Sequence, residues 1–279
     1  MYEQPHIAYI LPTYKALDYA KLCLHSLLRY SNEIRLTVVV VDDATPGWDE
    51  AWCTKDLPGH GTVLVHRFTD NGGLTRSWNA GFRIASQLSP QYIVAGNSDV
   101  LVPPQWWFGL WSGLQGNMDF VGPLTNAPGT TQGNVQDVRR WLHDYKLSDD
   151  AGDIAATQHS LRGRYCGARA SPINGFFMCG AAQTWWKYAH SAQDVFPPSI
   201  PFMPSGRKNP TPLRTGQEDH LCAKVRSAGR LTGAALSSFV FHYRSVSRGS
   251  AFARRGGLWY RRKEEAAGPD TTGDPTPER

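Results

Sequence analysis

The sequence lacks the features that mark several common classes of protein. Its five cysteines are widely spaced and form no Cys-x-x-Cys pair, which argues against a disulfide framework or a zinc site and indicates reduced thiols. No apolar run approaches the roughly 20 residues that a membrane-spanning helix needs. No signal-peptide pattern opens the chain. We therefore expect a soluble, cytoplasmic protein that is at most associated with a membrane.

Phosphate-binding glycine motifs are missing as well. The pair Gly72-Gly73 belongs to neither a G-x-G-x-x-G nor a Walker sequence, so neither a dinucleotide-binding fold nor a P-loop is supported. The net charge is only +5, and the basic residues are scattered except near the C-terminus. Such a charge suits an anionic ligand such as a nucleotide diphosphate, or a membrane surface, but it does not indicate nucleic-acid binding.

The first hundred residues alternate between apolar strands and amphipathic helices. The run at 35–41 is β-branched and shows no alternation, which is typical of a strand covered on both faces and hence of a parallel sheet. We expect the first strand to end at Pro12, which begins a loop. The pattern predicts an α/β fold. The expected strands are 6–11, 35–41, 61–67 and 92–96, and the expected helices are 18–30 and the segment from the Gly72-Gly73 turn to about residue 88.

Polar residues stand where the predicted strands end. Asp42 and Asp43 follow the strand at 35–41, and Asn97-Ser98-Asp99 follows the strand at 92–96. Open α/β sheets bind ligands at the carboxyl ends of their strands, so these residues are candidates for a site. The alternatives are structural: a turn for Asp42 and Asp43, and capping of a helix at 106–114 for Asn97, Ser98 and Asp99.

The second half is harder to interpret. Residues 116–170 show no clear periodicity and predict only a short helix at 137–146. A strand is expected at 173–180 and a helix with Trp185 after it. Glu218-Asp219 immediately precedes a helix that ends at Gly229, and a strand at 234–241 ends at His242. Helix capping explains one of the two carboxylates well and both poorly, while a lone histidine is more often structural.

The order and spacing of five motifs resemble a family-2 glycosyltransferase of GT-A fold. The motifs are Pro12-Thr13-Tyr14, the Val-Val-Asp-Asp-Ala-Thr segment at 40–45, Asn71-Gly72-Gly73, Asn97-Ser98-Asp99-Val100 and Asn174-Gly175-Phe176-Phe177. The resemblance covers about residues 6–248. It implies a single domain with a Rossmann-like, mostly parallel central sheet flanked by helices. Within it, residues 1–115 would be the nucleotide-sugar-binding half and 116–250 the acceptor-binding and catalytic half.

The resemblance also implies an activity. A sugar, of hexosyl type, would move from a nucleotide-diphospho-sugar, UDP- or dTDP-linked, to a hydroxyl of a glycan, lipid-linked or other acceptor, with inversion at the anomeric carbon. The residues implied to bind the nucleotide sugar are Pro12, Thr13, Tyr14, Asp42, Asp43, Asn71, Gly73, Arg76, Asn97, Ser98, Asp99, Asn174 and Gly175.

A divalent metal, Mn²⁺ or Mg²⁺, would be held by Asp99 and His242, and Asp219 of the pair Glu218-Asp219 would be the catalytic base. Oxygen and imidazole ligands suit such a cation, and a carboxylate suits a general base. This chain has Asn97 where many members of the family have an aspartate. That departure motivates an alternative: a catalytically silent relative that binds a sugar nucleotide or a glycan.

The C-terminus is distinct in composition. Residues 251–265 place arginines and a lysine around Leu258-Trp259-Tyr260. Two interpretations stay open: a basic amphipathic segment in peripheral contact with anionic lipid, or a solvated run of charge. The Gly, Pro, Thr and Asp content of residues 266–279 predicts a disordered tail.

Overall fold

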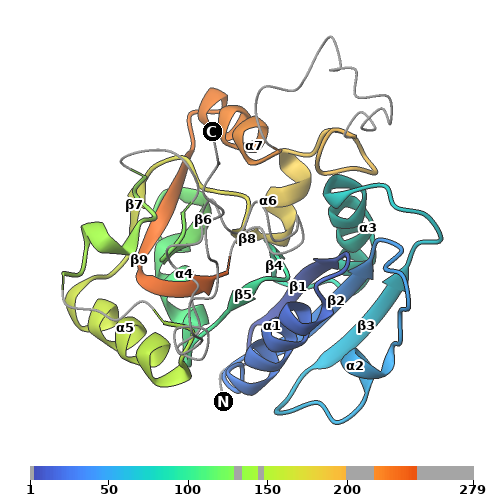
Figure 1. Ribbon diagram of the computed structural model, residues 1–279. Helices are drawn as coiled ribbons and strands as arrows, with labels where there is room; N and C mark the ends of the chain where they lie inside the picture. Colours follow the sequence, from blue (N-terminus) through green and yellow to red (C-terminus); the bar gives the residue numbers. More distant parts are fainter. Residues whose placement is uncertain (1–2, 129–133, 144–147, 199–216, 244–279) are drawn as a thin grey trace, which may run out of the picture.

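The computed structural model describes residues 3–128, 134–143, 148–198 and 217–243. The segments at 251–265 and 266–279 lie outside these residues. Within the described part, nine strands form one mixed sheet in the order β3-β2-β1-β4-β8-β6-β9-β5, and β7 pairs with β9 (Figure 1). The strands are β1 (His6–Thr13), β2 (Arg35–Asp42), β3 (Thr62–Arg67), β4 (Tyr92–Gly96), β5 (Val100–Leu101), β6 (Met118–Thr125), β7 (Ala168–Ala170), β8 (Phe177–Ala181) and β9 (Leu231–His242). The helices are α1 (Leu17–Arg29), α2 (Ala51–Thr54), α3 (Leu74–Gln87), α4 (Trp106–Leu114), the 3-10 turn η1 (Val138–Arg140), α5 (Ala151–Arg164), α6 (Ala182–Lys187) and α7 (Gln217–Ser227).

The first four strands pair in parallel with one another, as the sequence predicts. Alternate residues of a strand point to opposite faces, and in β1 both sets are buried. Ile7 and Tyr9 pack with α1 and α4, whereas Ala8 and Ile10 pack with α3, α6 and α7. Helices thus cover both faces, which is why β1 and β2 are apolar without alternation.

The second half of the chain joins this sheet through antiparallel strands. β8 runs antiparallel beside β4, with Phe177 opposite Gly96. β5 pairs antiparallel with the end of β9, with Val100 opposite His242. The start of β8 and the end of β9 therefore lie at the carboxyl edge of β4, and the two halves meet there.

Residues 116–170 contain more regular structure than the sequence indicates. They form β6, α5 and β7, and the helix expected at 137–146 is only the short turn η1; residues 144–147 of that prediction lie outside the described part. Helix α5 packs through Ile154 and Leu161 on β9. Its first turn is capped by Asp150, whose carboxylate accepts from the backbone amides of Gly152 and Asp153.

Two expectations about element ends are wrong. β1 does not stop at Pro12: it continues to Thr13, with Pro12 opposite Val41. A proline is tolerated there because the pairing of β1 with β4 ends at Ile10, and no ladder bond is lost. β8 begins at Phe177, later than the expected strand at 173–180.

The other two corrections concern acidic residues near helices. Asn97, Ser98 and Asp99 do not cap α4, whose N-cap is Gln105 in a left-handed conformation without a side-chain hydrogen bond. Glu218 and Asp219 lie inside the first turn of α7 and do not precede the helix.

Two further observations bear on the class of protein. None of the helices in the described ranges is both long and apolar enough to cross a membrane. All five cysteines are unpaired; Cys166 is exposed and the other four are buried.

Gly96, the last residue of β4, is the tightest point of the sheet edge. A Cβ at this position would come within 2.0 Å of the Tyr9 hydroxyl, and Tyr9 is fully buried. We predict that Gly96→Ala lowers the free energy of unfolding by about 1–3 kcal/mol, because the core must shift to admit the methyl group. Chemical denaturation measures this difference.

Gly163→Ala in α5 is the matched control, since a Cβ there meets nothing within 4 Å. Replacing a helical glycine by alanine should leave the stability unchanged or raise it by about 0.5–1 kcal/mol. Equal effects of the two substitutions would contradict the close packing of Tyr9 on Gly96.

Candidate active site

The candidate residues gather where β1, β2, β3 and β4 end. In the parallel register Thr13 lies opposite Asp42, and Asp42 lies opposite Arg67. The backbone amide of Asn97, one residue beyond β4, donates to the carbonyl oxygen of Phe176 at 2.8 Å. The motif before β8 is thereby joined to the motif after β4.

Asp42 forms hydrogen bonds to groups at the ends of β2 and β3. Its side chain is fully buried, and its carboxylate accepts from the backbone amide of Thr45 at 3.0 Å and from the Arg67 guanidinium at 3.2 Å. Asp42 therefore stabilises the turn after β2 and fixes Arg67 at the end of β3.

Asp43 holds the glycine turn that opens α3. Its carboxylate accepts from the backbone amides of Gly72 at 3.0 Å and Gly73 at 2.6 Å, and from the Arg76 guanidinium at 2.8 Å. Asn71 donates to the backbone carbonyl of Asp43 at 3.2 Å. A carboxylate at a helix N-terminus satisfies amides that have no partner within the helix and is favoured by the helix dipole. The Asp-Asp and Asn-Gly-Gly motifs thus meet in one structural unit.

Arg76 is held by several contacts within the protein. Besides Asp43, it pairs with Asp70 at 3.0 Å, and its guanidinium lies 3.9 Å from the centroid of the Phe68 ring. The two carboxylates raise its pKa against the opposing effect of burial. Arg76 therefore remains charged at the rim of the edge.

The first loop contributes residues of different accessibility. Pro12 and Thr13 are buried, whereas Tyr14 is half-buried and the Lys15 ammonium lies 5.0 Å from the centroid of its ring. The carbonyl oxygen of Thr13 accepts from the amide of Asp43 at 2.9 Å. Of these three, Tyr14 offers a ring face on which a nucleobase could stack.

Asn97, Ser98 and Asp99 form the bend between β4 and β5. Asn97 and Ser98 are partly exposed, whereas Asp99 is buried, with only 7% of its surface exposed. The Tyr9 hydroxyl donates to the carbonyl oxygen of Asn97 at 3.1 Å, which fixes the bend from beneath. The carbonyl oxygen of Asp99 accepts from the amide of Tyr243 at 2.9 Å.

His242 faces Asp99 across this bend. Its Nε2 lies 3.3 Å from Oδ1 of Asp99, and its ring stacks on Phe176 with centroids 4.9 Å apart and planes at 15°. Its Nδ1 lies 3.2 Å from the carbonyl oxygen of Ala127. A carbonyl oxygen can only accept, so Nδ1 carries a proton and Nε2 is the atom directed at the carboxylate.

This donor pair fits a divalent cation. With Nδ1 protonated, a neutral imidazole directs the Nε2 lone pair at a carboxylate oxygen, which is favourable only when a proton or a cation lies between them. Adjacent ligands of an octahedral ion bound at about 2.1 Å lie roughly 3 Å apart, close to the observed 3.3 Å. Within the described ranges, no group of three or more His, Cys, Asp or Glu side chains is placed to hold a metal. Asp99 and His242 would therefore supply two ligands of a shell completed by other groups.

Two residues that sequence reasoning missed support the site, Asn126 at His242 and Gln136 at Asn174. Asn126 accepts from the amide of His242 at 2.8 Å and donates to its carbonyl oxygen at 3.2 Å, so both backbone groups are fixed by one side chain. The buried Gln136 accepts from the amide of Asn174 at 2.7 Å and donates to Pro123 at 2.9 Å. Both residues lie in a stretch rich in Gly, Thr, Asn and Gln, so nothing in the sequence singles out either of them.

The turn before β8 meets the first turn of α7. Asn174 donates to the carbonyl oxygen of Pro128 at 2.6 Å. A Cβ on Gly175 would lie 2.9 Å from Oε2 of Glu218, so only a glycine lets this carboxylate approach. Gln217 contacts Thr75 of α3, which brings the start of α7 to the start of α3.

Glu218 and Asp219 differ in their surroundings. Burial raises the pKa of Glu218, the charge of Asp219 adds to this, and a hydrogen bond from the Gly175 backbone opposes it. Asp219 is exposed to solvent. One carboxylate of the pair is therefore held at the sheet edge, and the other is accessible to a ligand that arrives from solvent.

Comparison with known proteins identifies the family of this chain. The family model described as glycosyl transferase family 2 matches residues 9–173, more than half of the chain. The chain belongs to this family. The matched segment includes the Asp42-Asp43 and Asn97-Ser98-Asp99 motifs and ends directly before Asn174. A comparison with curated proteins finds no match.

Two solved structures share the fold. GalNAc-T7, with UDP, GalNAc and Mn²⁺, superposes with a TM-score of 0.58 at 14% identity, over 86% of this chain and 43% of that chain. The mannosyltransferase PcManGT from Pyrobaculum calidifontis, in complex with GDP-Man and Mn²⁺, gives a TM-score of 0.53 at 16% identity, over 92% of this chain and 62% of that chain. The chain thus spans less than two thirds of either neighbour. The expected GT-A fold is confirmed.

The structural role of Asp43 can be tested without a substrate. We predict that Asp43→Asn lowers the free energy of unfolding by about 3 kcal/mol, because Arg76 loses its buried partner and two amides lose a charged acceptor. Asp70→Asn is the control: it also pairs with Arg76, but its side chain is 75% exposed, so it should cost less than about 1 kcal/mol. Urea denaturation of both variants measures the difference, and equal losses would contradict the role given to Asp43.

Proposed function

We propose that this member of glycosyl transferase family 2 transfers a sugar from a nucleotide-diphospho-sugar to an acceptor hydroxyl. The observation that carries the proposal is the buried Asp99-His242 pair, whose histidine stacks on Phe176, the residue after Gly175. The two fold neighbours were solved with UDP or GDP-Man and with Mn²⁺, which supports a nucleotide donor and a divalent metal here.

Asp99 and His242 would hold Mn²⁺ or Mg²⁺. A bound cation of this kind offsets the negative charge that develops on the leaving phosphates. The residues of this chain keep the two ligands in position: Tyr9 fixes the bend that carries Asp99, and Asn126 with Phe176 fixes His242.

The donor would lie along the edge formed by the first half. Tyr14 would stack on the nucleobase, and Asn97, Ser98 and the turn at Asn174 would contact the ribose, phosphates and sugar. Five of the residues named from the sequence already contact other protein groups, so we propose that they shape this edge and set its charge: Asp42, Asp43, Asn71, Gly73 and Arg76. Uracil or thymine remains our choice of base, and a hexose our choice of sugar.

In the reaction, the acceptor oxygen forms a bond to the anomeric carbon. The bond from that carbon to the phosphate oxygen breaks, and the nucleoside diphosphate leaves with the electron pair. The acceptor proton passes to a carboxylate, for which we propose Asp219 because an acceptor from solvent can reach it. A base opposite the leaving group makes the displacement direct, with inversion of the anomeric configuration.

The first prediction concerns donor and metal. We expect one member of a panel of UDP-, dTDP- and GDP-sugars to release free nucleoside diphosphate slowly with Mn²⁺, and EDTA, Asp99→Ala and His242→Ala to abolish the release. Electron paramagnetic resonance of Mn²⁺ should show weaker binding in both variants. Calorimetric binding of a donor without release under any metal would favour the alternative, a catalytically silent relative, for which Asn97 in place of an aspartate is the motivating feature.

The second prediction concerns the base. Once a donor and acceptor pair is known, Asp219→Asn should lower kcat by about 10²- to 10⁴-fold, as expected for loss of a general base, while leaving donor affinity nearly unchanged. Glu218→Gln should have a smaller effect. The pH dependence of kcat/KM separates this assignment from the opposite one.

If Glu218 were the base, Asp219→Asn would retain turnover, and the fall in rate on the acid side would move to lower pH. The direction follows because Asp219 helps to raise the pKa of Glu218, and its removal lowers that pKa. Full activity in both variants would exclude the pair from catalysis.

A further inference from the structure

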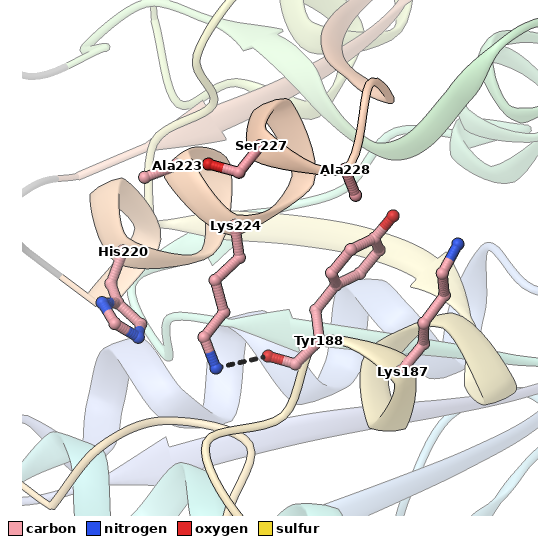
Figure 2. A pocket seen from close by; sticks show the side chains of 7 residues that line it. All are labelled: Lys187, Tyr188, His220, Ala223, Lys224, Ser227 and Ala228. Carbon is pink, nitrogen blue, oxygen red and sulfur yellow. Dashed lines mark hydrogen bonds between the residues drawn. The ribbon is translucent and has the colours of Figure 1, made fainter.

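A pocket of about 510 Å³ lies between α6 and α7, outside the contacts used above (Figure 2). Helix α7 contributes residues spaced three or four apart, which share one face of the helix. Residues from the end of α6 form the opposite wall. The lining residues are Lys187, Tyr188, His220, Ala223, Lys224, Ser227 and Ala228.

Two backbone carbonyls position Lys224 in this pocket. Its ammonium donates to the carbonyl oxygens of Tyr188 at 3.1 Å and Ala189 at 2.9 Å. Carbonyl groups are neutral, so these bonds fix the ammonium without removing its charge. An ammonium has three N-H donors, so a ligand can accept a hydrogen bond beside these two carbonyls.

Lys187 adds a second positive charge. Its ammonium lies 5.0 Å from the centroid of the Tyr188 ring, and Figure 2 shows it on the other side of that ring from the Lys224 ammonium. No carboxylate is among the residues that line the pocket. The positive potential of the two lysines therefore lies open to an anion.

The carboxylate beside Tyr188 is already paired. Asp119 is paired with Arg230 at 2.8 Å and accepts from the Tyr188 hydroxyl at 2.6 Å. Glu218 and Asp219 belong to the first turn of α7 but do not line the pocket, and Glu218 lies against Gly175.

His220 completes the polar lining. Burial lowers its pKa, and the charges of Lys224 and His190 lower it further. Its Nε2 is buried and has no hydrogen-bond partner among the described residues. His220 follows Asp219 directly in the chain, so this end of the pocket lies beside the proposed base.

We propose that the α6-α7 pocket binds a phosphate group, and that this group belongs to the acceptor. A phosphate offers acceptor oxygens and a charge that the Lys224 ammonium and the His220 imidazole can bind, while Lys187, on the other side of the Tyr188 ring, adds positive potential. The phosphate site stands on the pocket alone, whereas its assignment to the acceptor rests on the proposed transferase function. The two parts are tested separately.

The first test is calorimetric titration of the full chain with inorganic phosphate, in EDTA so that no metal draws phosphate to the donor edge. We expect saturable binding that Lys224→Met weakens about three- to tenfold, as loss of one charged contact would, and that Lys187→Met also weakens through loss of its positive potential. Lys55→Met is the matched control, because it removes an exposed lysine outside the pocket, and it should leave the affinity unchanged.

Lys187→Met tests the site with little risk of unfolding the protein. Lys187 is exposed, whereas Lys224 holds two backbone carbonyls and its variant needs a check by thermal unfolding. The ring resonances of His220, assigned through His220→Asn, should shift on addition of phosphate. No binding, or equal affinity in the wild type and Lys187→Met, would overturn the phosphate site.

The second test uses the donor found by nucleoside diphosphate release and compares glucose 1-phosphate with glucose as acceptors. We expect faster transfer to the phosphorylated sugar, and about a three- to tenfold rise of its KM in Lys187→Met with donor hydrolysis unchanged. Phosphate binding without this preference would overturn the acceptor assignment and leave free phosphate as the ligand. Absence of donor turnover would refute the transferase function without touching the binding result.

Discussion

The structure depends on the antiparallel pairing of β8 with β4 and of β5 with β9. The parallel strands alone end in a row of polar residues without a catalytic partner. The pairings bring Phe176 and His242 to that row from residues far along the chain, because Phe177 lies opposite Gly96 and Val100 lies opposite His242. These two strand registers bring Asp99 and His242 together at this edge.

Around that edge, polar groups are held by protein partners before any ligand binds. Asp43 holds the glycine turn, Tyr9 holds the carbonyl of Asn97, and Asn126 holds both backbone groups of His242. A preorganised site spends little free energy on ordering when the substrate arrives. Glu218, half-buried against Gly175, and exposed Asp219 differ in the same way: the first is held by the protein, and the second is the residue we propose as the base.

The sequence predicted the first half well, because each strand there is a continuous apolar run buried on both faces and each helix has clear periodicity. It failed for β6, whose run is interrupted by Gly122 and Pro123, and for α5, whose buried contacts rest on few apolar residues. The motif residues of the site were named correctly as neighbours at one sheet edge. Their supports, such as Asn126, could not be, since a contact across 116 residues leaves no local signal.

The separation along the chain of the contacts at this edge also bears on how the protein folds. Asp43 and Gly73 are 30 residues apart, whereas Asn126 and His242 are 116 apart. Closing a longer loop costs more chain entropy, and distant contacts form more slowly. The part of the edge formed by the first half of the chain can therefore take shape while the ribosome is still synthesising β9, and His242, the proposed metal ligand, is the last of these residues to arrive.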